Sequence, residues 1–240
     1  MKLNELQTED NVKLLLLGES GMGKTVLACG FPTPIKIYDF DNKVSSAAKF
    51  YSDDAARLSS IEVEQYAGLP VKERMSTFLA DVKSIENLQH SGKPLPFKTL
   101  VVDSLTTLTN AILEDYKKVS QLGIKRALAD VNAMQDYQLL QIHLTQLITG
   151  LLSLKCNVIF IGHTQLEKDE ATGAMKNNIL MPGQLAFKLP IYFEEVYLAK
   201  INAKGERVLQ TQSDSKTSLR SQRKLAPEIP ATYAAIMGGK

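Results

Sequence analysis

The chain has 240 residues, 44% of them hydrophobic, which is enough for one large domain with a buried core. Its 28 basic and 26 acidic side chains nearly cancel, so overall charge does not indicate a nucleic-acid-binding protein. The basic side chains gather between Lys200 and Lys224, where seven stand against two acidic ones. No apolar stretch could span a bilayer and no signal peptide is present, so we expect a cytoplasmic protein without a membrane partner.

Five short apolar runs have the composition of buried strands. They cover residues 12–17, 35–40, 61–66, 98–103 and 157–162. Because segments with helical periodicity separate several of these runs, the pattern predicts an α/β fold with a mainly parallel central sheet flanked by helices.

Two segments have the apolar spacing of long helices, and one has the pattern of a hairpin. The first helix is expected after Pro70, between the third and fourth strands, and the second over about residues 131–154. Near the C-terminal end, residues 202–205 form a turn signal between two alternating runs. We therefore expect antiparallel C-terminal strands and a single domain over residues 1–240, with its core at 12–226.

A glycine-rich loop directly follows the first predicted strand. It reads GESGMGKT and fits the phosphate-binding pattern G-x-x-x-x-G-K-[ST], the P-loop. Its residues are Gly18, Glu19, Ser20, Gly21, Met22, Gly23, Lys24 and Thr25. The glycines allow backbone N–H groups to surround a phosphate. We expect ATP and Mg²⁺ as cofactors, with Lys24 on the β- and γ-phosphates and the Thr25 hydroxyl on the metal, whereas Glu19 and Met22 look like variable positions.

Asp103 stands at the C-terminal end of the fourth predicted strand, where ligands of α/β sheets bind. We expect it to hold Mg²⁺ through water, with Ser104 beside it. Capping of the following helix is an alternative role, and the two roles are compatible. The guanine-recognition sequence N-K-x-D is absent from the chain, which disfavours a GTPase.

The order of these elements resembles the RecA-type ATPase core, and in particular the compact phage-encoded recombinases related to single-strand annealing proteins. The resemblance covers about residues 12–226. In that family an acidic residue after the second strand positions the attacking water, and the sequence IYDFDNK places Asp39 and Asp41 there. Position favours Asp41, where the family usually has glutamate. The family's magnesium strand ends in Asp-Ser after four apolar residues, as this chain does at Asp103.

The same resemblance implies a polar sensor of the γ-phosphate at the end of the fifth strand. His163 occupies that position, and Gln165 is the second choice. A lone histidine at a strand end more often has a structural role, but the neighbouring motifs favour a function here.

The resemblance also implies two loops that face DNA, at residues 119–130 and 164–182. The second loop has more acidic than basic residues and no aromatic side chain for base stacking, so a solvated loop is an equal alternative there. The side chains that could neutralise backbone phosphates are Lys125 and Arg126 in the first loop and Lys168 and Lys176 in the second.

Residues 211–225 fall where relatives carry basic side chains that reach the γ-phosphate of a neighbouring subunit. Lys216, Arg220 and Arg223 are the candidates, and their role would be that of arginine fingers. An exposed basic tail is the alternative. A site completed by a neighbour implies a homo-oligomer, either a ring or a filament.

The resemblance thus implies a RecA-like ATPase whose hydrolysis depends on single-stranded DNA and which acts in phage DNA recombination or annealing. Its partners would be single-stranded DNA, further copies of the chain and a phage single-strand DNA-binding protein, in the cytoplasm of a bacterial host. Three alternatives stay open at this point: a replication-associated helicase or loader motor, a small-molecule kinase, and a binding module that uses ATP only as a switch.

Overall fold

Residues 11–119, 134–168, 173 and 175–238 are described by the computed structural model. All five predicted strands are present, and they pair in parallel. They are β1 (Lys13–Gly18), β2 (Ile35–Asp39), β3 (Ile61–Gln65), β4 (Thr99–Asp103) and β5 (Asn157–Lys168). The prediction of a mainly parallel sheet is therefore confirmed.

The sheet continues beyond β1 into the C-terminal part of the chain. Its strand order is β3-β2-β4-β5-β1-β7-β8-β9, with β7 (Glu195–Ile201) parallel to β1. β8 (Arg207–Gln210) and β9 (Glu228–Pro230) add antiparallel strands, and the predicted turn at residues 202–205 joins β7 to β8. The antiparallel end of the sheet is thus confirmed as well.

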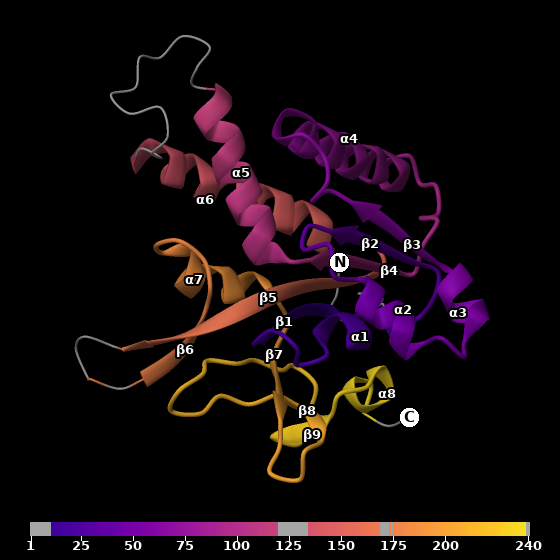
Figure 1. Ribbon diagram of the computed structural model, residues 1–240, viewed down its shortest axis with the longest axis vertical. Helices are drawn as coiled ribbons and strands as arrows, with labels where there is room; N and C mark the ends of the chain where they lie inside the picture. Colours follow the sequence, from indigo (N-terminus) through magenta and orange to yellow (C-terminus); the bar gives the residue numbers. More distant parts are fainter. Residues whose placement is uncertain (1–10, 120–133, 169–172, 174, 239–240) are drawn as a thin grey trace, which may run out of the picture.

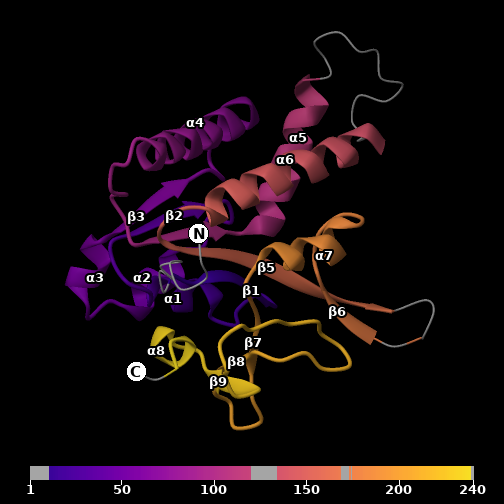
Figure 2. The same cartoon turned by 180° about the vertical axis from the view of Figure 1, so that it is seen from behind.

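Helices cover both faces of the sheet (Figures 1 and 2). One face carries α4 (Val71–His90), α5 (Leu105–Val119), α6 (Met134–Leu152), α7 (Leu185–Lys188) and the 3₁₀ helix η3 (Leu189–Tyr192). The other face carries α1 (Lys24–Cys29), α2 (Ser45–Phe50), α3 (Ala55–Ser59) and α8 (Tyr233–Ile236). None of the helices in the described part of the chain is long and apolar enough to cross a membrane.

The four leucines of β1 explain why both faces are covered. Side chains alternate along a strand, so Leu15 and Leu17 enter the hydrophobic core under α4, α5 and α6, whereas Leu14 and Leu16 enter the core under α1. All four are almost completely buried, and burying each leucine stabilises the fold by about 2 kcal/mol. A strand with two apolar faces belongs in the centre of a sheet, which is where β1 lies.

Strand β5 differs from the prediction. Residues 164–182 were expected to form an irregular loop, and this is wrong for most of them, because β5 continues to Lys168 and pairs antiparallel with β6 (Met175–Ile179). We call residues 164–179 the β5–β6 hairpin. Ile179 is buried in the main core, and Glu167 accepts hydrogen bonds from Gln165 of its own strand and from Asn178 across the strands. The core contact and the bond from Asn178 account for regular pairing in a polar sequence.

Candidate active site

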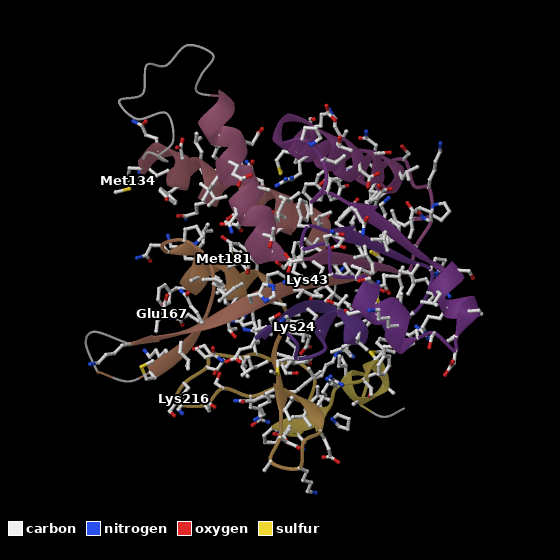
Figure 3. All side chains as sticks on the ribbon, in the orientation of Figure 1. Lys24, Lys43, Met134, Glu167, Met181 and Lys216 are labelled. Carbon is white, nitrogen blue, oxygen red and sulfur yellow. The ribbon has the colours of Figure 1, made fainter. Side chains whose placement is uncertain are left out.

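A cavity of about 280 Å³ opens at the carboxyl edge of the parallel strands. Strand β5 lies between β1 and β4, so the register places His163 beside Gly18 and places Asp103 beside Ile161. The residues predicted for the site that line this cavity are Ser20, Gly21, Gly23, Lys24, Thr25, Asp41, Asp103 and His163. Figure 3 shows Lys24 together with Lys43, a second lysine of the cavity wall, near the centre of the molecule.

The P-loop depends on glycine at two positions for different reasons. A Cβ atom on Gly18 would lie 2.7 Å from the backbone oxygen of Ala199 in β7, which is too close for any side chain. Gly23 has a φ of 84°, in the left-handed region that disfavours other residues. Of the non-glycine positions, Met22 packs against the hydrophobic core, whereas Glu19 is exposed.

Lys24 is buried against its own loop. Its side chain donates hydrogen bonds to the backbone oxygens of Gly18, at 2.8 Å, and of Glu19, at 2.7 Å. Burial lowers the pKa of Lys24 to about 8, although the nearby carboxylates of Asp103 and Asp41 act in the opposite direction. The ammonium group therefore lies at the floor of the cavity, with a position set by two backbone carbonyls.

Thr25 and Asp103 are joined by a hydrogen bond. The Thr25 hydroxyl donates to Oδ2 of Asp103 at 2.6 Å. Burial raises the pKa of Asp103 to about 6, the bond from Thr25 opposes this rise, and the neighbouring carboxylates of Asp41 and Asp39 add to it. Hydroxyl and carboxylate oxygens are ligands that Mg²⁺ prefers, and a divalent cation would offset the crowded negative charge. The pair therefore fits Mg²⁺, which when bound would neutralise charge on the β- and γ-phosphates.

The two aspartates after β2 have different surroundings. Asp39 is fully buried, and its Oδ1 accepts the backbone N–H groups of Asp41, at 3.1 Å, and Asn42, at 2.8 Å. It shapes the turn that carries Asp41. Asp41 lines the cavity, where its Oδ1 accepts a hydrogen bond of 2.9 Å from the Ser104 hydroxyl and another from the Thr107 hydroxyl.

His163 meets Asp41 across the cavity. Its Nε2 lies 2.9 Å from Oδ2 of Asp41, a contact between residues 122 positions apart. Burial raises the pKa of the Asp41 carboxyl, but the hydrogen bonds from His163, Thr107 and Ser104 outweigh it and hold the pKa at about 2. Asp41 is therefore an ionised acceptor for three donors at neutral pH.

Comparison with known proteins assigns the chain to a family. The family described as "AAA domain" matches residues 10–221. The chain belongs to the AAA domain family. The match spans the P-loop, Asp103 and His163, so this AAA domain is a P-loop ATPase, with ATP and Mg²⁺ as the general ligands of such a site.

No curated protein sequence matches this AAA domain. Among solved structures, one is titled "Structural and biochemical analysis of a prototypical ATPase from the type III secretion system of pathogenic bacteria". It shares 16% sequence identity and a TM-score of 0.48, over 79% of this chain. The chain spans about half, 52%, of that protein.

Five residues of the cavity wall were not predicted from the sequence, namely Val26 of α1 and four others. Lys43, Ser46 and Phe50 come from α2 and the turn before it, and Arg207 comes from the start of β8. Arg207 lies against the P-loop, since a Cβ atom on Gly23 would be 2.9 Å from its Cδ. The hairpin turn at residues 202–205 could have indicated Arg207. Because β7 runs parallel to β1, this turn lies at the carboxyl edge of the sheet, and β8 begins there.

The basic candidates of the C-terminal segment lie outside this cavity. Lys216 and Arg220 are exposed, and Figure 3 shows Lys216 away from Lys24. Arg223 instead points to Glu195 of the same chain, with 3.6 Å between Nε and Oε1. The backbone of the segment is held by β7, through a bridge between Val196 and Arg220, and by β6, since Asn177 donates to the Lys216 oxygen at 2.7 Å.

The predicted DNA-contacting residues separate into two groups. Lys125 and Arg126 lie outside the described residues. Lys168 and Lys176 lie on the β5–β6 hairpin, where Lys168 pairs with Met175 and Lys176 pairs with Glu167. Lys168 lies five residues beyond His163 along the same strand β5.

Proposed function

We propose that this AAA domain hydrolyses Mg-ATP while acting on single-stranded DNA, as a RecA-like recombinase or annealing ATPase of the phage-encoded type. The observation that carries the proposal is the continuity of β5. His163 lies in the nucleotide cavity, and five residues further along the same strand Lys168 lies in the β5–β6 hairpin. A change at the γ-phosphate would move His163, and the strand that carries it continues directly into the hairpin.

The nucleotide chemistry follows from the cavity wall. Lys24 would exchange its two carbonyl acceptors for oxygens of the β- and γ-phosphates. Thr25 and Asp103 would hold Mg²⁺ on the β4 side. Asp41 and His163 line the same cavity, with Asp41 bonded to Ser104, the residue after Asp103, and the attacking water would approach the γ-phosphate there. ADP and phosphate would leave through the open side of the cavity.

The DNA-binding part of the proposal rests on the hairpin. Lys168 is exposed, and Lys176 stands on the partner strand beside it. Glu167 is engaged by Gln165 and Asn178, so hydrogen bonds within the hairpin take up part of its acceptor capacity. Lys168 and Lys176 belong to successive pairs, so their side chains lie on opposite faces of the hairpin. Each lysine would contact backbone phosphates on its own face without reading sequence, as expected of a protein that binds any single strand.

An oligomer would complete the site. Lys216 and Arg220 are exposed, so either side chain is available to a neighbouring subunit. A ring or filament in which one of them reaches the neighbour's γ-phosphate would add positive charge where negative charge develops in the transition state. We propose a phage single-strand DNA-binding protein as a further partner, because it would share the same DNA.

The decisive experiment measures ATP turnover with and without a single-stranded oligonucleotide. We expect DNA to stimulate the wild-type protein and Lys24→Ala to abolish turnover under both conditions. The double variant Lys168→Glu/Lys176→Glu should keep its basal turnover and lose the stimulation. Lys93→Glu, which reverses an exposed charge beyond the end of α4, is the matched control.

Two results would contradict the proposal in different ways. If DNA does not change the rate of ATP turnover and ATP does not change DNA affinity, the protein is an ATPase but not a recombinase. ADP production that requires an acceptor metabolite would favour a small-molecule kinase instead. Unchanged nucleotide affinity in Lys24→Ala would remove the nucleotide site itself.

A further inference from the structure

We infer that His163 accepts the proton of the attacking water, and that Asp41 is a positioning residue that acts through the imidazole. The inference rests on the proposed ATP hydrolysis and assigns the proton transfer to one member of the Asp41–His163 pair. Asp41 alone would be the simpler choice, because an acidic residue commonly takes this role in the family that the sequence resembles.

The first argument is that the Asp41 carboxylate already accepts three hydrogen bonds. Oδ1 accepts hydrogen bonds from the hydroxyls of Ser104 and Thr107, and Oδ2 is bonded to His163. Its side chain is only 6% exposed. Oδ2 keeps one acceptor position, but little of the side chain is open to water, and the three donors hold the pKa of Asp41 at about 2, which makes the carboxylate a weak base.

The second argument is that His163 is held with one nitrogen free to act. The Asp41 carboxylate can only accept, so the shared proton resides on Nε2 and leaves the lone pair on Nδ1. In the described part of the chain, no residue forms a hydrogen bond with Nδ1. The backbone N–H of His163 donates to the Thr106 hydroxyl at 3.2 Å, which holds the backbone at this position. The side chain is 20% exposed and lines the cavity.

The proposed step conserves atoms and charge. The water oxygen forms a bond to the γ-phosphorus, the bond from that phosphorus to the bridging oxygen breaks, and ADP leaves with the electron pair. The water proton passes to Nδ1 of His163, and the resulting imidazolium is stabilised by the Asp41 carboxylate 2.9 Å from Nε2. Transfer of this proton to the phosphate product or to solvent restores the neutral imidazole.

The first test is His163→Gln. A glutamine amide nitrogen replaces Nε2 and can still donate to Asp41, but its oxygen is a very weak base. If His163 accepts the proton, turnover at saturating Mg-ATP should fall about 100-fold or more, with the affinity for a fluorescent ATP analogue unchanged. If His163 only senses the γ-phosphate by a hydrogen bond, glutamine should serve as well, and turnover within threefold of wild type would overturn the inference.

The second test is the pH dependence of turnover, which also works without any variant. A proton acceptor acts only in its deprotonated form, so wild-type turnover should rise with pH along an acidic limb and then level off. A flat profile would overturn the inference, because the Asp41 carboxylate stays ionised throughout. The other charged groups facing the cavity are Lys24, Lys43, Asp103 and Arg207.

Asp103 needs its own control, because its pKa of about 6 could also produce an acidic limb. The residual turnover of His163→Gln separates the two, since the acidic limb should disappear if it belongs to His163 and persist if it belongs to Asp103. Added imidazole should raise the turnover of His163→Gly but not that of Lys24→Ala. A wild-type protein that binds ATP without hydrolysing it would instead overturn the proposed function.

Discussion

The hydroxyl of Thr25 donates a 2.6 Å hydrogen bond to Oδ2 of Asp103, which joins the P-loop to the end of β4. The bond holds a buried carboxylate close to the carboxylates of Asp39 and Asp41. Such crowding of negative charge favours binding of a cation. Without a cation, the same repulsion between carboxylates lowers the stability of the fold.

We therefore expect Asp103→Asn to stabilise the ligand-free protein at neutral pH. Its pKa is raised from 3.8 to about 6, so between these values the folded state retains a proton that the unfolded state releases, and wild-type stability falls as pH rises. The asparagine variant has no such carboxyl, so its free energy of unfolding at neutral pH should exceed that of the wild type by at most about 3 kcal/mol. Urea unfolding in the presence of a chelator, at pH 4 and at pH 7.5, measures the free energy of unfolding of both proteins. If the variant and the wild type differ by the same amount at both pH values, the prediction is wrong.

Arg207→Ala should weaken nucleotide binding. Arg207 is exposed at the start of β8 and lies against Gly23, so its guanidinium is available to phosphate oxygens or to the nucleotide base. Loss of one charge-assisted contact corresponds to about a tenfold lower affinity. Calorimetric titration with ADP measures the change, and Lys204→Ala in the adjacent turn is the control. Equal affinities for the two variants would place Arg207 outside the binding site.

Arg223→Ala should destabilise the fold more than Arg220→Ala. Glu195 is buried with a side chain 3% exposed, and Arg223 is the cation beside it. Removal of that cation leaves a buried carboxylate, which we expect to cost about 2–3 kcal/mol, although Glu195 keeps its hydrogen bond from the Tyr197 hydroxyl. The Arg220 guanidinium instead donates to the backbone oxygen of Ile191, at 3.4 Å, and its side chain is exposed. Denaturant midpoints that shift equally would exclude a structural role specific to Arg223.

If Arg220 acts on a neighbour's γ-phosphate, two inactive variants should complement each other. Lys24→Ala lacks a working P-loop, and Arg220→Ala lacks the basic side chain. In a randomly mixed oligomer about a quarter of the interfaces combine an intact Lys24 with an intact Arg220, so an equimolar mixture should regain that share of turnover. The double variant added to either protein should restore none. If Arg220→Ala alone is fully active, Arg220 does not act on the neighbour's γ-phosphate, and Lys216→Ala should be tested in the same way.

Much of the fold could be predicted because local patterns determine it. The run from Leu14 to Leu17 requires burial on both faces, and the glycines at 18 and 23 meet backbone requirements that no other residue satisfies. The β5–β6 hairpin could not be predicted in this way. The sequence of β6 is polar except at its ends, and its pairing depends on the core contact of Ile179.

The contacts of the site depended on pairings that are distant in the sequence. The positions of Asp41 and His163 could be inferred from the family resemblance, but the bond between them arises because β5 inserts between β1 and β4. Arg207 reaches Gly23 only through the register of β7 and β8. A local pattern carries no information about such a register.

The two carbonyl bonds of Lys24 have a consequence for how a nucleotide is captured. These bonds hold the loop in its curled form and fix the position of the ammonium group. A phosphate would replace one pair of acceptors with another, so the lysine side chain would need little reordering and little conformational entropy would be lost on association. A loop of fixed shape can bind a phosphate group without rearranging. More of the binding free energy is then available to hold the nucleotide in line for attack.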